Sequence, residues 1–279
     1  MPTGRIGLVD DCLDNFHAKT YLAAFRSELA DRGWEVTGAF ALQNGESRRF
    51  ADEHRVPLVD SIDDLASHVD AFAILAPSSP QTHLPLCEQV LPYAKPTFVD
   101  KTFAVDYGQA CSVFDLADRF ATPVQTTSAL RSTNIQAYCR QLRAPIRSIT
   151  VWAGGDTFDE YGVHPVELVI SCLAVAPSRL VTSTSDPLMT ILLDFPDGVA
   201  ATIHFNAREH LPFEALVESA EDKRLLRVDD SRLFVDAARG ILDFFDAGQP
   251  LVPREQTLSV MRILDAAKRP EAGTKWVGL

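Results

Sequence analysis

The first half of the chain alternates between short apolar runs and longer amphipathic segments, and this alternation limits the folds open to it. Residues 6–9 (IGLV) form an apolar run, and residues 15–31 carry apolar side chains near one helical face. The run AFAILA at residues 71–76 suits a strand that is buried on both faces of a parallel sheet. Repeated strand–helix units of this kind predict an α/β fold with a doubly wound parallel sheet.

The pattern changes after about residue 121. Alternating segments (RSITVWA, LMTILLDF, VAATIHF, FEALVES, KRLLRVD, RLFVD) indicate strands, FPDGVA indicates a hairpin turn, and residues 165–175 and 254–268 indicate helices. We therefore predict a Rossmann-like domain over residues 1–122. Residues 123–279 are predicted as an α+β domain with a mostly antiparallel open sheet, and its terminal helix is a candidate to pack back on the first domain.

Composition excludes several classes of protein. The 279 residues carry a formal net charge of −12, which argues against a nucleic-acid partner. No apolar run approaches the ~20 residues that cross a bilayer, so no membrane partner is expected. The N-terminus lacks the pattern of a secretory signal, and the five cysteines are unpatterned. These features predict a cytoplasmic location.

Lys101 is the first candidate for chemistry. It follows the predicted strand in PTFVDK, and ligands of open α/β sheets bind at the carboxyl ends of strands. A lysine at this position can therefore face the ligand crevice. The alternative is a solvated lysine in a loop, which Lys101 taken alone favours.

His164 is the second candidate, in the segment EYGVHPVEL. Pro165 suits the first position of a helix, which puts His164 at the N-cap and Glu167 where it would complete a capping box. A helix N-terminus disfavours the imidazolium form, and a neutral histidine can accept a proton from a hydroxyl. Glu160, four residues earlier, is a candidate to orient the imidazole. The alternative is helix capping and nothing more.

These segments together resemble the Gfo/Idh/MocA oxidoreductases, which include glucose–fructose oxidoreductase and inositol dehydrogenase. Residues 70–104 resemble the family's stretch that ends in Glu-Lys-Pro, with Lys101 on the lysine and Asp100 and Thr102 in place of its neighbours. The segment EYGVHPVEL is similar to the family's Asp-x-Gly-x-His-x-x-Asp, with His164 on the histidine. Arg131 in SALRSTN is similar to the arginine that follows the domain crossover. The resemblance covers nearly the whole chain.

The resemblance implies an activity and a set of residues. His164 would act as general base on a substrate hydroxyl while hydride leaves the same carbon for NAD or NADP, and Lys101 would stabilise the oxyanion. It implies Lys101, His164 and Glu160 as catalytic residues and Arg131 as a substrate contact beside the first two. The substrate would be a sugar, a cyclitol or a related small molecule, and the open sheet would form a homodimer or homotetramer. The residues expected to contact the cofactor are Asp10, Asp11, Asn15, Gln43, Pro77, Ser78, His83 and Asp100.

The loop after the first strand departs from the family. It reads DDCLDN, without the G-x-G-x-x-G glycines that let a pyrophosphate approach the backbone. Asp10, Asp11 and Asp14 are expected to face the phosphate position, where each like-charge contact at ~4 Å costs about 1 kcal/mol in water and about 4 kcal/mol at a dielectric near 20. Asp14 or Asn15 could cap the following helix instead.

The second cofactor signal is also altered. Gln43 and Asn44 stand where an acidic residue for the ribose hydroxyls is expected, and Arg48 and Arg49 could instead meet a 2′-phosphate. Two alternatives to a nicotinamide-dependent enzyme therefore stay open. One is a cofactor-independent epimerase, isomerase or lyase that uses the same lysine and histidine, and the other is a non-catalytic binding or scaffolding protein.

No metal site is predicted, because none of the candidate ligands has a diagnostic spacing. These candidates are His17, Asp10, Asp11, His83 and His164. The alternative for His83 is an ordinary core histidine with satisfied hydrogen bonds.

Overall fold

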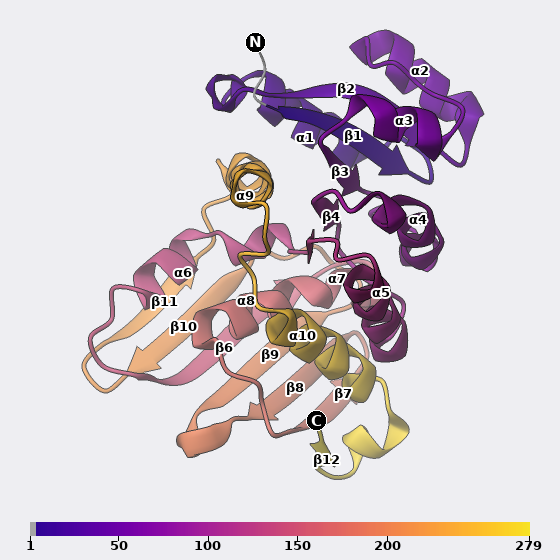
Figure 1. Ribbon diagram of the computed structural model, residues 1–279. Coiled ribbons are helices and arrows are strands. Elements are labelled where there is room, and N and C mark those ends of the chain that lie inside the picture. The colour runs from indigo at the N-terminus through magenta and orange to yellow at the C-terminus, as the bar shows by residue number, and fades with distance from the viewer. Residues whose placement is uncertain (1–3) are drawn as a thin grey trace. The chain divides into compact units, whose positions relative to one another are not determined.

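Figure 1 shows the computed structural model, which describes residues 4–279. The chain divides into two compact units. The first comprises Met1–Thr127 with Phe234–Pro253, and the second comprises Ser128–Leu233 with Arg254–Leu279. The segment that returns to the first unit is therefore residues 234–253, and the terminal helix belongs to the second unit.

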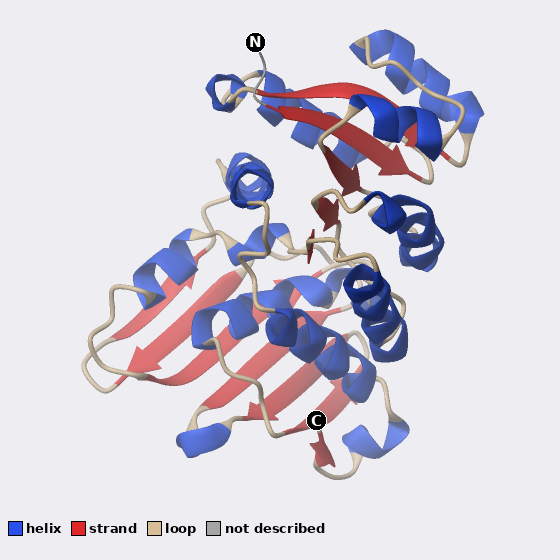
Figure 2. Ribbon diagram, in the orientation of Figure 1, coloured by secondary structure: helices blue, strands red, loops and turns tan. Residues whose placement is uncertain are grey.

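The sheet of the first unit confirms the predicted α/β fold (Figure 2). Within residues 4–279 its five parallel strands are β1 (Gly4–Asp10), β2 (Trp34–Ala41), β3 (Ala71–Ile74), β4 (Thr97–Val99) and β5 (Val124–Gln125). Their order is β2-β1-β3-β4-β5. Since the chain moves from β1 to one side and then returns to the other, the order reverses between β1 and β3. Sheets of this type bind ligands at that switch point, outside the carboxyl ends of the strands.

The predicted strand at residues 71–76 lies in the middle of this sheet. All four residues of β3 are buried, as its unbroken apolar sequence indicated. The helices of the unit are α1 (Phe16–Arg26), α2 (Asn44–His54), α3 (Ile62–His68), α4 (His83–Val90), α5 (Tyr107–Arg119) and, from Phe234 on, α9 (Leu233–Ala247).

The helix α9 corrects one prediction. RLFVD at residues 232–236 was interpreted as a strand, but it enters a helix whose apolar residues recur at helical spacing and are buried. The Phe245 ring lies 5.3 Å from the Trp34 ring of β2. Asp246 accepts a hydrogen bond from the Trp34 indole at 2.7 Å. This packing on Trp34 favours the helix over a strand.

The sheet of the second unit is mixed, and mostly antiparallel as predicted. Its strands within the described residues are β6 (Ile146–Gly154), β7 (Arg179–Ser185), β8 (Leu188–Asp194), β9 (Ala200–Asn206), β10 (Glu214–Ser219), β11 (Lys223–Arg227) and β12 (Val277–Gly278). Their order is β11-β10-β6-β9-β8-β7-β12, and only β6 and β9 pair in parallel. The turn Pro196–Gly198 joins β8 to β9, which confirms the predicted hairpin.

Helices cover one face of this second sheet (Figure 1). The helices of the unit are α6 (Asn134–Cys139), α7 (Phe158–Tyr161), α8 (Val163–Leu173) and α10 (Arg254–Ala267). Side chains such as Ile203 and Phe205 of β9 are buried, whereas the alternate His204 is half-buried. The other face of the sheet therefore includes polar side chains such as His204, although Leu188, Leu192 and Leu225 are exposed on this unit.

Short 3₁₀ turns complete the chain. They lie at Ala30–Arg32, Pro80–Thr82, Leu91–Tyr93, Ala129–Arg131, Pro196–Gly198 and Pro270–Gly273. None of the described helices combines the length and the apolar character that a bilayer-spanning helix needs.

Candidate functional site

Asp10 is the last residue of β1 and lies at the switch point of the first sheet, between β1 and β3. The side chain is buried. One carboxyl oxygen accepts the Asn15 side-chain amide at 2.8 Å, and the other accepts the Cys12 backbone N–H at 3.2 Å. The backbone of Ala76, two residues past β3, also hydrogen-bonds to this carboxyl group. Burial raises the pKa of Asp10 to about 7, against the lowering effect of these hydrogen bonds.

Asp11 ties the same loop to the segments that follow β2 and β3. Its Oδ2 accepts hydrogen bonds from the Gln43 amide at 3.1 Å and from the Ser79 hydroxyl at 3.2 Å. Asn15 caps α1, since its side chain accepts the Ala18 N–H at 2.9 Å, which confirms that predicted cap. The structure thus brings together four of the predicted cofactor residues, Asp10, Asp11, Asn15 and Gln43, by direct contacts.

Asp14 does not act as predicted. It was expected to repel a pyrophosphate together with Asp10 and Asp11. Instead, its carboxylate forms ion pairs with Lys19 and Arg49, and these cations compensate its charge. Arg49, a candidate for a 2′-phosphate, is engaged in the same contact. The electrostatic argument therefore rests on Asp10 and Asp11 alone.

A buried aspartate in contact with a histidine lies at the carboxyl end of β4. Asp100 follows β4 directly, is fully buried, and contacts the Nδ1 atom of His17 in the first turn of α1. Its other oxygen, Oδ1, has no hydrogen-bond partner among residues 4–279. The His17 ring packs edge-on against Tyr21 at 5.6 Å and Phe234 at 5.8 Å between ring centroids. Sequence reasoning missed this pair, although both residues follow strands of the same parallel sheet.

Lys101 lies next to Asp100, at the edge where the prediction placed it. The side chain is buried, and a cis peptide bond joins it to Thr102. Pro77 and Ser78 follow β3 at the same edge. The first unit therefore gathers Asp100, Lys101 and the segment after β3 at the carboxyl ends of the central strands.

His83 differs from these residues because it lies in the core. The side chain is fully buried. Its Nδ1 atom lies 3.1 Å from the Phe103 carbonyl oxygen, and its Nε2 atom lies 3.2 Å from those of Leu75 and Ala76. Burial lowers the pKa of His83, which favours the neutral ring. Its full burial supports the alternative of a core histidine over a cofactor contact.

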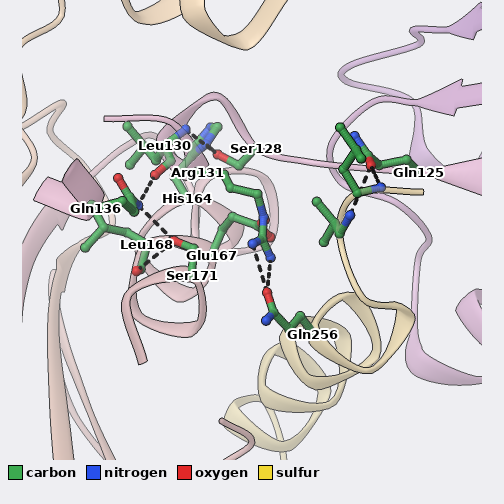
Figure 3. Close-up of polar contacts among 12 residues, drawn as sticks. Gln125, Ser128, Leu130, Arg131, Gln136, His164, Glu167, Leu168, Ser171 and Gln256 are labelled. Atoms are coloured by element: carbon green, nitrogen blue, oxygen red, sulfur yellow. Dashed lines mark hydrogen bonds and ion pairs between the residues drawn. The ribbon is translucent and has the colours of Figure 1, made fainter. Parts of the chain in front are cut away.

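His164 is paired with Ser128 in the second unit (Figure 3). Its Nδ1 atom lies 2.7 Å from the Ser128 hydroxyl, which also accepts the Leu130 backbone N–H at 3.1 Å. The ring packs against Tyr161 and Phe213. When Nδ1 carries the proton and donates it to Ser128, Nε2 holds the lone pair that a general base needs. The sequence carried no signal for Ser128.

The predicted capping box around His164 is wrong. The helix α8 begins at Val163, so that His164 is its second residue and Pro165 its third. Glu160 belongs to the preceding short helix α7, and Gly162 between the two helices has right-handed helical backbone angles. Because the helix starts directly after Gly162, the cap position falls on this glycine, and no side chain caps α8.

Arg131 holds the second unit together (Figure 3). Its Nε donates to the Glu167 carboxylate at 2.5 Å, and its two terminal nitrogens donate to the Gln256 side-chain oxygen at 2.8 and 2.7 Å. Burial raises the pKa of Glu167, and the positive charge of Arg131 opposes this rise. These contacts give Arg131 a structural role, joining α8 to α10, rather than the predicted substrate contact.

No group of three or more His, Cys, Asp or Glu side chains that could hold a metal ion occurs within residues 4–279. The candidate chemistry of the two units therefore consists of Lys101 beside the His17–Asp100 pair in the first and His164 with Ser128 in the second.

Solved structures share this fold over the whole chain. GenD2 from gentamicin A biosynthesis, solved in complex with NAD, has 14% identity and a TM-score of 0.83, covering 100% of this chain and 97% of that chain. Myo-inositol 2-dehydrogenase from Lactobacillus plantarum has 15% identity and a TM-score of 0.82, covering 100% of both chains. An oxidoreductase from Agrobacterium radiobacter, solved with NAD+, L-tartaric acid and magnesium, has 12% identity and a TM-score of 0.80, covering 99% of this chain and 98% of that chain.

A family model matches the first unit. No curated protein sequence matches the chain. The model of GFO_IDH_MocA, an oxidoreductase family with an NAD-binding Rossmann fold, matches residues 13–127. The match begins after β1 and after Asp10, Asp11 and Cys12, the loop residues that depart from the glycine-rich pattern. Residues 13–127 of this chain are thus similar to the Gfo/Idh/MocA oxidoreductase family.

Proposed function

We propose that the chain is a NAD- or NADP-dependent oxidoreductase that acts on a hydroxyl or keto group of a sugar, a cyclitol or a related small molecule. The family match over residues 13–127 carries this proposal. Two of the similar structures were solved with NAD, and a third is a myo-inositol dehydrogenase by name. In the sequence resemblance, Lys101 and His164 correspond to the family's lysine and histidine.

His164 and Lys101 have complementary roles in this proposal. His164, with its Nδ1 proton held by Ser128, accepts the proton of the substrate hydroxyl at Nε2. The Lys101 ammonium stabilises the negative charge that develops on the same oxygen. Glu160, in the helix before His164, is the third proposed catalytic residue. The nicotinamide, when bound, supplies the hydride acceptor.

The loop after β1 does not fit a pyrophosphate in the way that a glycine-rich loop does. Every residue from Asp10 to Asn15 carries a Cβ atom. The Asp10 carboxyl group accepts the hydrogen bonds at the switch point, and Asp11 adds a carboxylate beside it. We therefore expect a dinucleotide to bind weakly, or with its pyrophosphate displaced from the start of α1.

A second candidate function follows from this loop. The same Lys101 and His164 suit proton transfer on a sugar-like substrate without a cofactor, as in an epimerase, an isomerase or a lyase. The observation that favours it is the Asp10 carboxyl group at the switch point, where the pyrophosphate of a dinucleotide is usually held. The family match favours the oxidoreductase as the first candidate.

Titration of the pure protein with NAD(H) and NADP(H), followed by calorimetry and nicotinamide fluorescence, tests the proposal. We expect saturable binding, and nicotinamide reduction with a member of a panel of polyols. Replacing Asp10 and Asp11 by glycine is expected to tighten NAD(H) binding by about tenfold or more, since about 1.4 kcal/mol of repulsion corresponds to that factor. Asp31→Gly is the matched control, since it removes an exposed carboxylate outside the loop.

Two outcomes would contradict these expectations. If neither cofactor binds at millimolar concentration while the protein exchanges substrate carbon-bound protons with deuterated water, the oxidoreductase is refuted and proton transfer replaces it. Tight NAD(H) binding with the pyrophosphate against the Asn15 end of α1 would show that the electrostatic argument about the loop is wrong.

A further inference from the structure

Two cysteines from different helices meet in the second unit. Cys139 is the last residue of α6, and Cys172 lies one residue before the end of α8. The two thiols are joined by a side-chain hydrogen bond. Both residues are half-buried.

The two helices are fixed against each other next to the thiols. Gln136 of α6 donates to the Ser171 hydroxyl of α8 at 2.8 Å and to the Leu130 carbonyl at 2.6 Å (Figure 3). Ser171 is the neighbour of Cys172, and Gln136 precedes Cys139 by about one helical turn. The thiol pair is therefore held by a defined contact between two helices.

A cavity of about 490 Å³ opens beside the pair. Both cysteines line it, together with the apolar side chains of Leu142, Phe195 and Val199 and with the cation Arg143. All of these residues belong to the second unit. The cavity gives a small molecule a path to the Cys139 sulfur.

The surroundings of the two thiols shift their pKa values in opposite directions. The hydrogen bond from Cys172 and the positive charge of Arg140 lower the pKa of Cys139. The same hydrogen bond and burial raise the pKa of Cys172, which therefore keeps its proton. Cys139 therefore carries the larger thiolate fraction of the pair, and Cys172 is placed to react with the product that forms on the Cys139 sulfur.

We propose that Cys139 and Cys172 form a reactive dithiol site whose substrate is a small hydroperoxide entering through this cavity. The Cys139 thiolate attacks one peroxide oxygen and breaks the O–O bond, which leaves a sulfenic acid and an alkoxide or hydroxide that takes up a proton. The Cys172 sulfur then attacks the Cys139 sulfur, and hydroxide leaves with the Cys172 proton as water. The two thiols lose two electrons in total, and the peroxide gains them.

This site is separate from the residues of the proposed function. His164 lies eight residues before Cys172 on α8, about 12 Å along the helix axis. The inference stands on the thiol pair and the cavity, and it holds whether the protein is an oxidoreductase, a proton-transfer enzyme or neither.

Treatment of the reduced full-length protein with a stoichiometric amount of hydrogen peroxide tests the proposal. We expect the loss of two of the five thiols, and peptide mapping by mass spectrometry to find one bond between Cys139 and Cys172. In Cys172→Ser, dimedone is expected to trap a sulfenic acid at Cys139 at a rate at least about tenfold above that at Cys111. Cys111→Ser is the matched control, since it removes a half-buried cysteine of α5 and should leave the bond intact.

The wild-type experiment decides the matter even if a variant fails to fold. Oxidation of Cys139 no faster than that of Cys111, or thiol loss without a bond between Cys139 and Cys172, overturns the proposal. Circular dichroism of each variant shows whether its result belongs to a folded protein.

Discussion

The titration of Asp10 is expected to make the stability of the protein depend on pH, and Asp10→Asn should remove that dependence. The pKa of this carboxyl group rises from 3.8 to about 7 in the folded chain because the group is buried. Between these two values the folded protein binds a proton that the unfolded chain has released, so stability falls as pH rises through this window and is level above about 7. From about pH 5 to about pH 7 the change is about two units at 1.36 kcal/mol each, or about 3 kcal/mol.

The variant separates this effect from the loss of a hydrogen bond. Asparagine offers one acceptor oxygen to the donors that now meet at Asp10, and the lost hydrogen bond costs about 1 kcal/mol at every pH. The free energy of unfolding from urea titrations of both proteins, between about pH 5 and about pH 8, should therefore diverge in favour of the variant by about 3 kcal/mol as pH rises. Asp14→Asn is the control, because Asp14 is ion-paired. Parallel curves for wild type and Asp10→Asn would refute the reasoning.

The remaining predictions concern activity, stability and assembly. Lys101→Ala and His164→Ala should each lower kcat at least about 100-fold while the thermal midpoint stays near that of the wild type, and full activity in either variant rules out its role. Arg131→Ala should lower the free energy of unfolding by about 3–5 kcal/mol, because it leaves the buried Glu167 charge unpaired, and a loss below about 1 kcal/mol in urea titrations contradicts this. Sedimentation at micromolar concentration should give at least a dimer that Leu192→Glu weakens, since exposed apolar side chains lie on the second sheet, and a monomeric mass excludes this.

Much of the fold follows from local sequence patterns. The apolar run at residues 71–76 predicted a central strand, and β3 occupies that place because it is covered on both faces. The segment RLFVD was misassigned because five residues fit both periods: Leu233 and Val235 alternate as in a strand, whereas Leu233 and Phe234 lie four residues before the buried Ala237 and Ala238, as in a helix. Packing of Phe245 on Trp34, 211 positions earlier in the chain, favours the helix.

The site was predictable where one element decides the contact. Lys101 was predicted at a strand end because it follows an apolar strand sequence directly. The cap at Asn15 was predicted because asparagine is favoured at the start of a helix. Two contacts depend on the three-dimensional fold of each unit. His17 contacts Asp100, 83 positions away, and His164 contacts Ser128, 36 positions away. No local pattern encodes such a separation, so these pairs emerged only with the fold.

The charge on Asp10 in the loop after β1 distinguishes the two candidate functions. A dinucleotide whose pyrophosphate approaches the switch point must compete with the Asp10 carboxyl group for the hydrogen bonds of Cys12 and Asn15, each worth about 1 kcal/mol, and meets Asp11 as well. Asp10 itself carries its charge only above a pH of about 7, so its repulsion is absent in acid and complete in base. An oxidoreductase built on this loop must therefore bind its cofactor more tightly as pH falls. A proton-transfer enzyme has no cofactor for this charge to repel, so its substrate binding need not follow the charge on Asp10.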